Sequence, residues 1–86
     1  MKMGKKQKGT YEAIFQTPIR SNIKWKDMEK LIIYLGGTIS EGSGSRVRIE
    51  LNGTLAVFHR PHPGNETDKG AVKDMRDFLN NAEVSI

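Results

Sequence analysis

The chain has 86 residues, which is room for one domain. It contains no cysteine, so disulfides and thiolate metal sites are excluded. No apolar run approaches the length of a membrane span. The formal net charge is +4, a balance that favours a polyanion or an acidic partner but also fits a basic protein with no nucleic-acid role.

The N-terminal end is basic, with four Lys residues among the first eight positions. No apolar stretch of the kind found in a secretory signal follows them, so we expect a cytoplasmic protein with no membrane partner. A run of like charges is typical of a solvated segment. We therefore predict a basic flexible tail over residues 1–9 and a single domain over residues 10–86.

Two helices are predicted in the first half of the chain. The first covers residues 10–16, with Thr10 as its cap and a following proline that ends it. The second begins near Trp25 and ends before the Gly36-Gly37 pair. Its apolar residues recur at helical spacing and should belong to the core: Trp25, Met28, Ile32 and Leu35.

A short strand and a hairpin follow. Residues 38–41 can form the strand, and residues 46–51 alternate between polar and apolar after a flexible turn. Asn52-Gly53 is the preferred pair for a type I′ hairpin turn, so residues 54–58 should return antiparallel.

The two-residue turn also fixes which residues face each other across the hairpin. The expected apolar pairs, which should meet the helices, are Leu51 with Thr54, Ile49 with Ala56, and Val47 with Phe58. The other face should carry Arg46 directly opposite His59. Arg48 follows on that same face.

The last third predicts one more helix, capped by Thr67 or Asp68 and ending at Asn80-Asn81. Its apolar stripe comprises Ala71, Val72, Met75, Phe78 and Leu79. Strands flanked by helices indicate an α+β fold with helices on one face of a small antiparallel sheet. The inner α-β-β-β-α order is that of a double-stranded-RNA-binding-type domain, here with a short extra N-terminal helix.

Two histidines and three arginines are the candidate site residues: His59, His62, Arg46, Arg48 and Arg60. Metal-free RNA cleavage needs a base for the 2′-hydroxyl, an acid for the leaving 5′-oxygen and a cation for the phosphorane. Histidine suits the first two roles, and arginine matches phosphate oxygens. The structural alternative makes His59 a sheet residue and His62 a turn residue that fixes its loop. We predict no metal site, since the chain has few soft ligands.

The order and spacing of several segments resemble HicA toxins over residues 11 to 83. The segments are residues 22–31, Leu35-Gly36-Gly37, Gly44-Ser45-Arg46, His62-Pro63-Gly64 and Lys69-Gly70-Ala71-Val72. The resemblance implies a double-stranded-RNA-binding-like fold and cleavage of mRNA without a metal or cofactor. It also implies growth inhibition, neutralisation by a HicB-type antitoxin bound over the active surface, and contact with DNA only through that antitoxin.

One position departs from the family pattern. HicA toxins usually carry their catalytic histidine directly after a Gly-Ser or Gly-Asp pair, where this chain has Arg46. Arginine does not deprotonate at neutral pH and cannot be the base. We hypothesise that His59 takes the base role, that Arg46 holds phosphate, and that His62 is the acid or contacts RNA.

Two alternatives stay open. The first is a non-catalytic module of the same fold that binds RNA or an antitoxin. The second is a structural or regulatory protein that pairs with a DNA-binding partner.

Overall fold

The computed structural model describes residues 4–61 and 64–84. In chain order its elements are α1 (Lys5–Ile14), β1 (Ile23–Lys24), α2 (Trp25–Tyr34), β2 (Thr38–Glu41), β3 (Arg46–Leu51), β4 (Thr54–His59), β5 (Glu66–Thr67) and α3 (Lys69–Asn81). Strands β2, β3 and β4 form one antiparallel sheet, and β1 pairs with β5 in a second. Among these residues, no helix has the length and apolarity that crossing a membrane requires.

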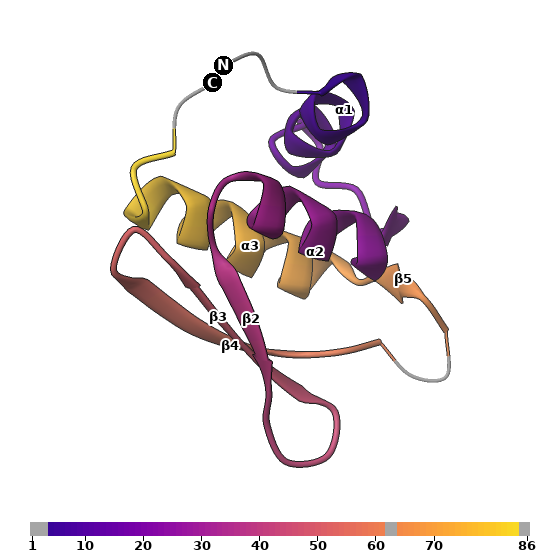
Figure 1. Ribbon diagram of the computed structural model, residues 1–86. Coiled ribbons are helices and arrows are strands. Elements are labelled where there is room, and N and C mark those ends of the chain that lie inside the picture. Colours follow the sequence, from indigo (N-terminus) through magenta and orange to yellow (C-terminus); the bar gives the residue numbers. More distant parts are fainter. Residues whose placement is uncertain (1–3, 62–63, 85–86) are drawn as a thin grey trace.

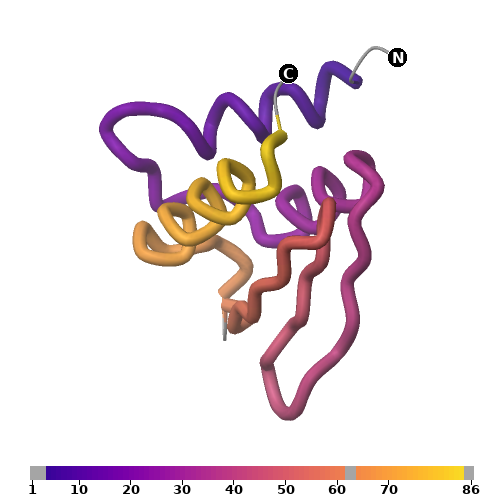
Figure 2. The backbone as a smooth tube through the Cα atoms, turned by 90° about the vertical axis from the view of Figure 1, so that its left-hand side faces the viewer, coloured from indigo at the N-terminus to yellow at the C-terminus, as the bar shows by residue number. Residues whose placement is uncertain are grey.

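The elements are stacked in three layers (Figures 1 and 2). Helices α2 and α3 lie between α1 and the β2–β3–β4 sheet, so they cover one face of that sheet and leave the other uncovered. The core draws buried side chains from all three layers, among them Ile14, Met28, Leu31, Val47, Ile49, Met75 and Leu79. The predicted α+β class and the α-β-β-β-α order are therefore confirmed.

The β3–β4 hairpin has the predicted register. Leu51 pairs with Thr54, Ile49 with Ala56, Val47 with Phe58, and Arg46 with His59. Both turn residues have positive φ, 51° at Asn52 and 79° at Gly53, as a type I′ turn requires.

The turn is also attached to the last helix. The Asn52 side-chain amide donates to the Ala82 carbonyl at 2.9 Å, and the Thr54 hydroxyl donates to the Asn81 carbonyl at 3.3 Å. Carbonyls at a helix C-terminus have no partner within the helix. The turn therefore satisfies the end of α3 and holds the hairpin against it.

The structure corrects one predicted helix start and decides between two predicted caps at another. Helix α1 begins at Lys5, within the segment predicted as a flexible tail, and the Thr10 hydroxyl donates to the Lys6 carbonyl within the helix instead of capping it. At the last helix, Thr67 belongs to β5, and the Asp68 side chain is the cap, accepting from the Ala71 amide at 2.8 Å. The short β1–β5 sheet has no periodic signal in the sequence.

Helix α1 is fixed to α3 at its C-terminal end by Arg76. The guanidinium donates to the Ile14 carbonyl through Nε at 3.0 Å and Nη2 at 2.9 Å, and to the Gln16 carbonyl at 2.8 Å. The Cζ atom of Arg76 lies 5.7 Å from the centre of the Phe15 ring. This cation satisfies carbonyls that the helix leaves unpaired and complements the helix dipole.

We predict that Arg76→Ala destabilises the protein by about 1.5–3 kcal/mol, the usual range for hydrogen bonds that involve a charged group. Urea unfolding measures the change. Amide hydrogen exchange should accelerate more in residues 5–14 than in α2. The matched control is Lys73→Ala, which removes an exposed α3 cation paired with Asp77 and should change stability by about 0.3–0.5 kcal/mol. Equal effects of the two substitutions would contradict this role of Arg76.

Candidate functional site

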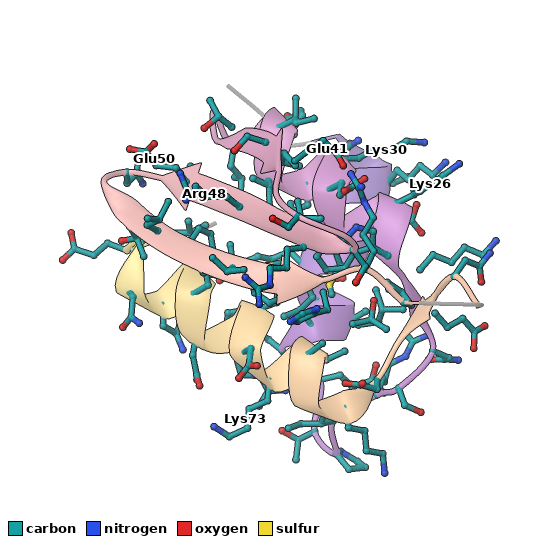
Figure 3. All side chains as sticks on the ribbon, turned by 90° about the horizontal axis from the view of Figure 1, so that it is seen from below. Lys26, Lys30, Glu41, Arg48, Glu50 and Lys73 are labelled. Carbon is teal, nitrogen blue, oxygen red and sulfur yellow. The ribbon has the colours of Figure 1, made fainter. Side chains whose placement is uncertain are left out.

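Three of the five predicted site residues share the uncovered face of the sheet. Arg46 on β3 lies directly across from His59 on β4, and Arg48 forms the next row with Val57. All four side chains are exposed, whereas the alternate residues Val47 and Phe58 are buried under the helices. We call this surface the outer sheet face. Figure 3 shows Arg48 and Glu50 on the side of the sheet away from α3.

A hollow of about 260 Å³ lies at the end of this face, beside the loop between β2 and β3. Its lining residues are Ser40, Glu41, Gly42, Ser43, Arg46, Arg48 and Val57. In the part of the chain that the structure describes, neither Arg46 nor Arg48 makes a side-chain hydrogen bond or ion pair. Two free guanidinium groups beside hydroxyl-bearing side chains can hold a phosphate group.

Arg60 lies in a different environment from the other candidates. Its Nη1 donates to Glu41 Oε1 at 2.7 Å, and its Nη2 contacts the second Glu41 oxygen and Glu29 Oε2, the latter at 3.5 Å. Its backbone amide donates to the Ser45 carbonyl at 2.9 Å. The guanidinium is thus neutralised by two carboxylates, and the backbone is held to the residue before β3.

Helix α2 completes this connection. The Trp25 indole donates to Glu29 Oε2 at 2.8 Å, and the Trp25 ring packs on Phe58 with the ring centres 5.7 Å apart. The side chains of Trp25, Glu29, Arg60 and Glu41 form what we call the Arg60 network. It links α2 and β2 to the residue that follows His59. Sequence reasoning missed both carboxylates, because neither is near Arg60 in the chain.

The remaining predicted residue, His62, lies outside the described residues. The structure therefore brings His59, Arg46 and Arg48 together and places Arg60 in the Arg60 network. Within residues 4–61 and 64–84, no group of three or more His, Asp or Glu side chains is placed to hold a metal ion.

The Arg60 network affects the titration of its most exposed member. The hydrogen bond from Arg60 holds the pKa of Glu41 below its ordinary value, and the positive charge of Arg60 acts in the same direction. The same contact raises the pKa of Arg60 above its already high value. Both groups are therefore charged at neutral pH.

We predict that Glu41 titrates below the usual range of glutamate and that Arg60→Gln returns its pKa to that range. A carboxylate with a lowered pKa stabilises the folded state at pH values above its ordinary pKa. This contribution disappears as the pH falls through the lowered value. Carboxyl ¹³C chemical shifts measured by NMR during a pH titration of the parent and of Arg60→Gln test the prediction. A Glu41 titration that Arg60→Gln leaves unchanged would contradict it.

The comparisons with known proteins identify the family. Residues 25–84 match the family described as HicA toxin of bacterial toxin-antitoxin, a match that covers most of the chain and includes α2, the sheet and α3. No curated protein and no solved structure was found to match. The match confirms the resemblance that the sequence motifs indicate. The chain therefore belongs to the HicA toxin family of bacterial toxin–antitoxin systems.

Proposed function

We propose that this toxin is a metal-independent endoribonuclease that cleaves mRNA with His59 as its base. The observation that carries the proposal is the cross-strand pair of His59 with Arg46 on the uncovered face of the sheet. Directly opposed residues have Cβ atoms about 4.5–5.5 Å apart, so one RNA phosphate and its neighbouring 2′-hydroxyl can reach both side chains. Family membership supports a toxic activity, and this pair supplies its chemistry.

The reaction that fits these residues is transesterification within the RNA. His59 takes the proton from the 2′-hydroxyl, and the 2′-oxygen attacks the adjacent phosphorus. The bond to the 5′-oxygen breaks, and this oxygen receives a proton from an acid, for which His62 is the candidate. The products are a 2′,3′-cyclic phosphate and a 5′-hydroxyl.

In this scheme Arg46 and Arg48 bind the phosphate that is cleaved. The extra negative charge of the phosphorane develops on its non-bridging oxygens, and a cation held beside them stabilises that state. Both guanidinium groups line the hollow next to β2, and neither is neutralised by a carboxylate among the described residues. Arg60, predicted as a third phosphate ligand, is already bound to Glu41 and Glu29. We assign it the role of positioning His59.

The outer sheet face also fits neutralisation by a HicB-type antitoxin. Leu55 and Val57 lie on this face and are 57% and 55% exposed. Such apolar side chains are what a protein partner buries at the centre of an interface, and the adjacent charges suit its rim. An antitoxin seated here would cover His59 and Arg46 together. The toxin would then contact DNA only through the antitoxin. The cytoplasm, where mRNA is found, stays the expected compartment.

A non-catalytic binding module is the second candidate. The observation that favours it is Arg46, because the family's usual histidine is absent from that position. Such a module would keep the outer sheet face and bind RNA or the antitoxin without cleavage.

We predict that His59→Ala lowers RNA cleavage about 10²- to 10⁴-fold, the usual contribution of general acid–base catalysis. Arg46→Gln should also slow cleavage, since it removes a phosphate ligand. Glu50→Gln is the control, because Glu50 lies on the same face two rows away and has no role in the chemistry. Digestion of a labelled single-stranded RNA measures the rates, and circular dichroism checks folding. Full activity in folded His59→Ala would refute His59 as the base.

Growth after induced expression separates the two candidates. The nuclease should arrest growth, His59→Ala should relieve the arrest, and a co-expressed HicB-type antitoxin should also relieve it. His62→Ala tests the acid in the same assay. Normal growth at confirmed protein levels would instead support the binding module.

A further inference from the structure

The positive charge of this protein is concentrated outside the part that matches the HicA family. Residues 25–84 carry eight Lys and Arg against nine Asp and Glu, whereas residues 1–24 carry six against one. The matched part therefore has a slightly negative net charge. Any general attraction of the chain to a polyanion must come mainly from the N-terminal segment that contains α1.

Some of these cations surround a hollow of about 330 Å³ between α1 and β1. Its lining residues are Lys6, Gly9, Thr10, Ala13, Arg20, Asn22, Ile23, Lys24 and Asp27. All of them except Asp27 lie outside the family match. We call this hollow the α1 hollow.

The cations of the α1 hollow are available to a ligand. Within the part of the chain that the structure describes, Lys6 and Lys24 make no side-chain hydrogen bond or ion pair. Arg20 uses only Nε, which donates to the Asn22 side chain at 3.0 Å, so both of its terminal nitrogens are unused there. Three cations face one carboxylate, that of Asp27. The hollow therefore has an excess of positive charge and free donors.

Gly9 leaves the backbone of α1 accessible at the edge of the hollow. It lies inside α1, where glycine is a poor helix former, and a Cβ added there would meet no atom within 4 Å. Packing within the described structure therefore does not require glycine at this position. A backbone without a side chain does allow a ligand to approach closely.

The site is also held in place. Arg76 fixes the C-terminal end of α1, and the two-residue strand β1 is paired with β5. In Figure 2, α1 lies on the opposite side of α2 and α3 from the sheet. A ligand bound beside α1 would therefore leave the outer sheet face free.

We propose that the α1 hollow binds the phosphodiester backbone of a nucleic-acid strand, as a second site separate from the outer sheet face. Lys6, Arg20 and Lys24 contact phosphates, and the Asn22 and Thr10 side chains lie beside them. Phosphate contacts of this kind read no sequence, so the site serves to hold the toxin on RNA. Because the site is on the far layer, it stays open when a protein covers the outer sheet face.

The test measures binding of two uncleavable single strands of the same sequence, one of DNA and one of 2′-O-methyl RNA, to the full chain. The triple variant K6Q/R20Q/K24Q should lower the slope of log affinity against log salt by roughly 2, about 0.7 for each lost contact. The control K30Q/K69Q/K73Q removes the same charge from α2 and α3 and should lower it by less than half as much. Equal losses in the two triples would overturn the proposal, since they would indicate diffuse attraction.

A second pair of variants tests the position without removing any cation. Gly9→Glu places a carboxylate beside the hollow, and Gly9→Gln places a neutral side chain of the same size there. Both should keep α1 intact by circular dichroism. Gly9→Glu should bind severalfold more weakly than Gly9→Gln, and equal affinities would overturn the site.

The two strands distinguish the source of the ligand chemistry. Equal affinity for DNA and 2′-O-methyl RNA supports contact with phosphates alone, whereas a severalfold preference for one strand would overturn it, because it would indicate recognition of the sugar. An absence of binding to either strand would also overturn it and would point to an acidic protein instead. Since neither strand can be cleaved, the outcome is independent of whether His59 is the base.

Discussion

The two-residue turn at Asn52-Gly53 determines where the chemically useful side chains of this protein lie. In a strand, successive residues point to opposite faces, so a slip of one residue would exchange the two faces of the sheet. The turn prevents this slip because both of its residues adopt positive φ, and because Asn52 is hydrogen-bonded to the end of α3. With the register fixed, Val47 and Phe58 are buried while Arg46 and His59 share the uncovered face.

The Arg60 network adds a second constraint at the other end of the hairpin. Arg60 follows His59 directly, and its guanidinium joins carboxylates from β2 and α2. Glu29 is held in turn by the Trp25 indole, whose ring packs on Phe58 in the same strand as His59. Trp25 is thus both a core residue and an anchor for the strand that carries His59. A surface ion pair alone stabilises a protein little. The ion pairs of Arg60 matter because they fix the position of the neighbouring residues, among them His59.

The sequence allowed the hairpin, the faces and α2 to be predicted because local signals specify them. Alternation, helical spacing and the Asn-Gly turn each depend on residues close together in the chain. The partners of Arg60 could not be predicted, because Glu29 and Glu41 come from other elements and only the packed fold brings them near. The early start of α1 was missed for a similar reason. Its Lys-rich beginning is typical of a solvated segment, and the docking by Arg76, 62 residues from Ile14, has no local signature.

The separation of charge from chemistry gives the molecule two faces with different requirements. Under the proposed function, the outer sheet face has to be reachable by RNA and also be closed by an antitoxin. Apolar side chains such as Leu55 and Val57 beside the arginines suit both needs. In that scheme, a strongly basic sheet face would make the antitoxin compete with tightly held RNA. Beside Arg46 and Arg48 this face also carries Glu50, and residues 25–84 together have a slightly negative net charge. Charge placed beside α1, behind α2 and α3, raises the attraction to a polyanion without that competition. If the α1 hollow binds RNA as proposed, α1 does more than enlarge the core, because it holds the toxin on RNA independently of the outer sheet face.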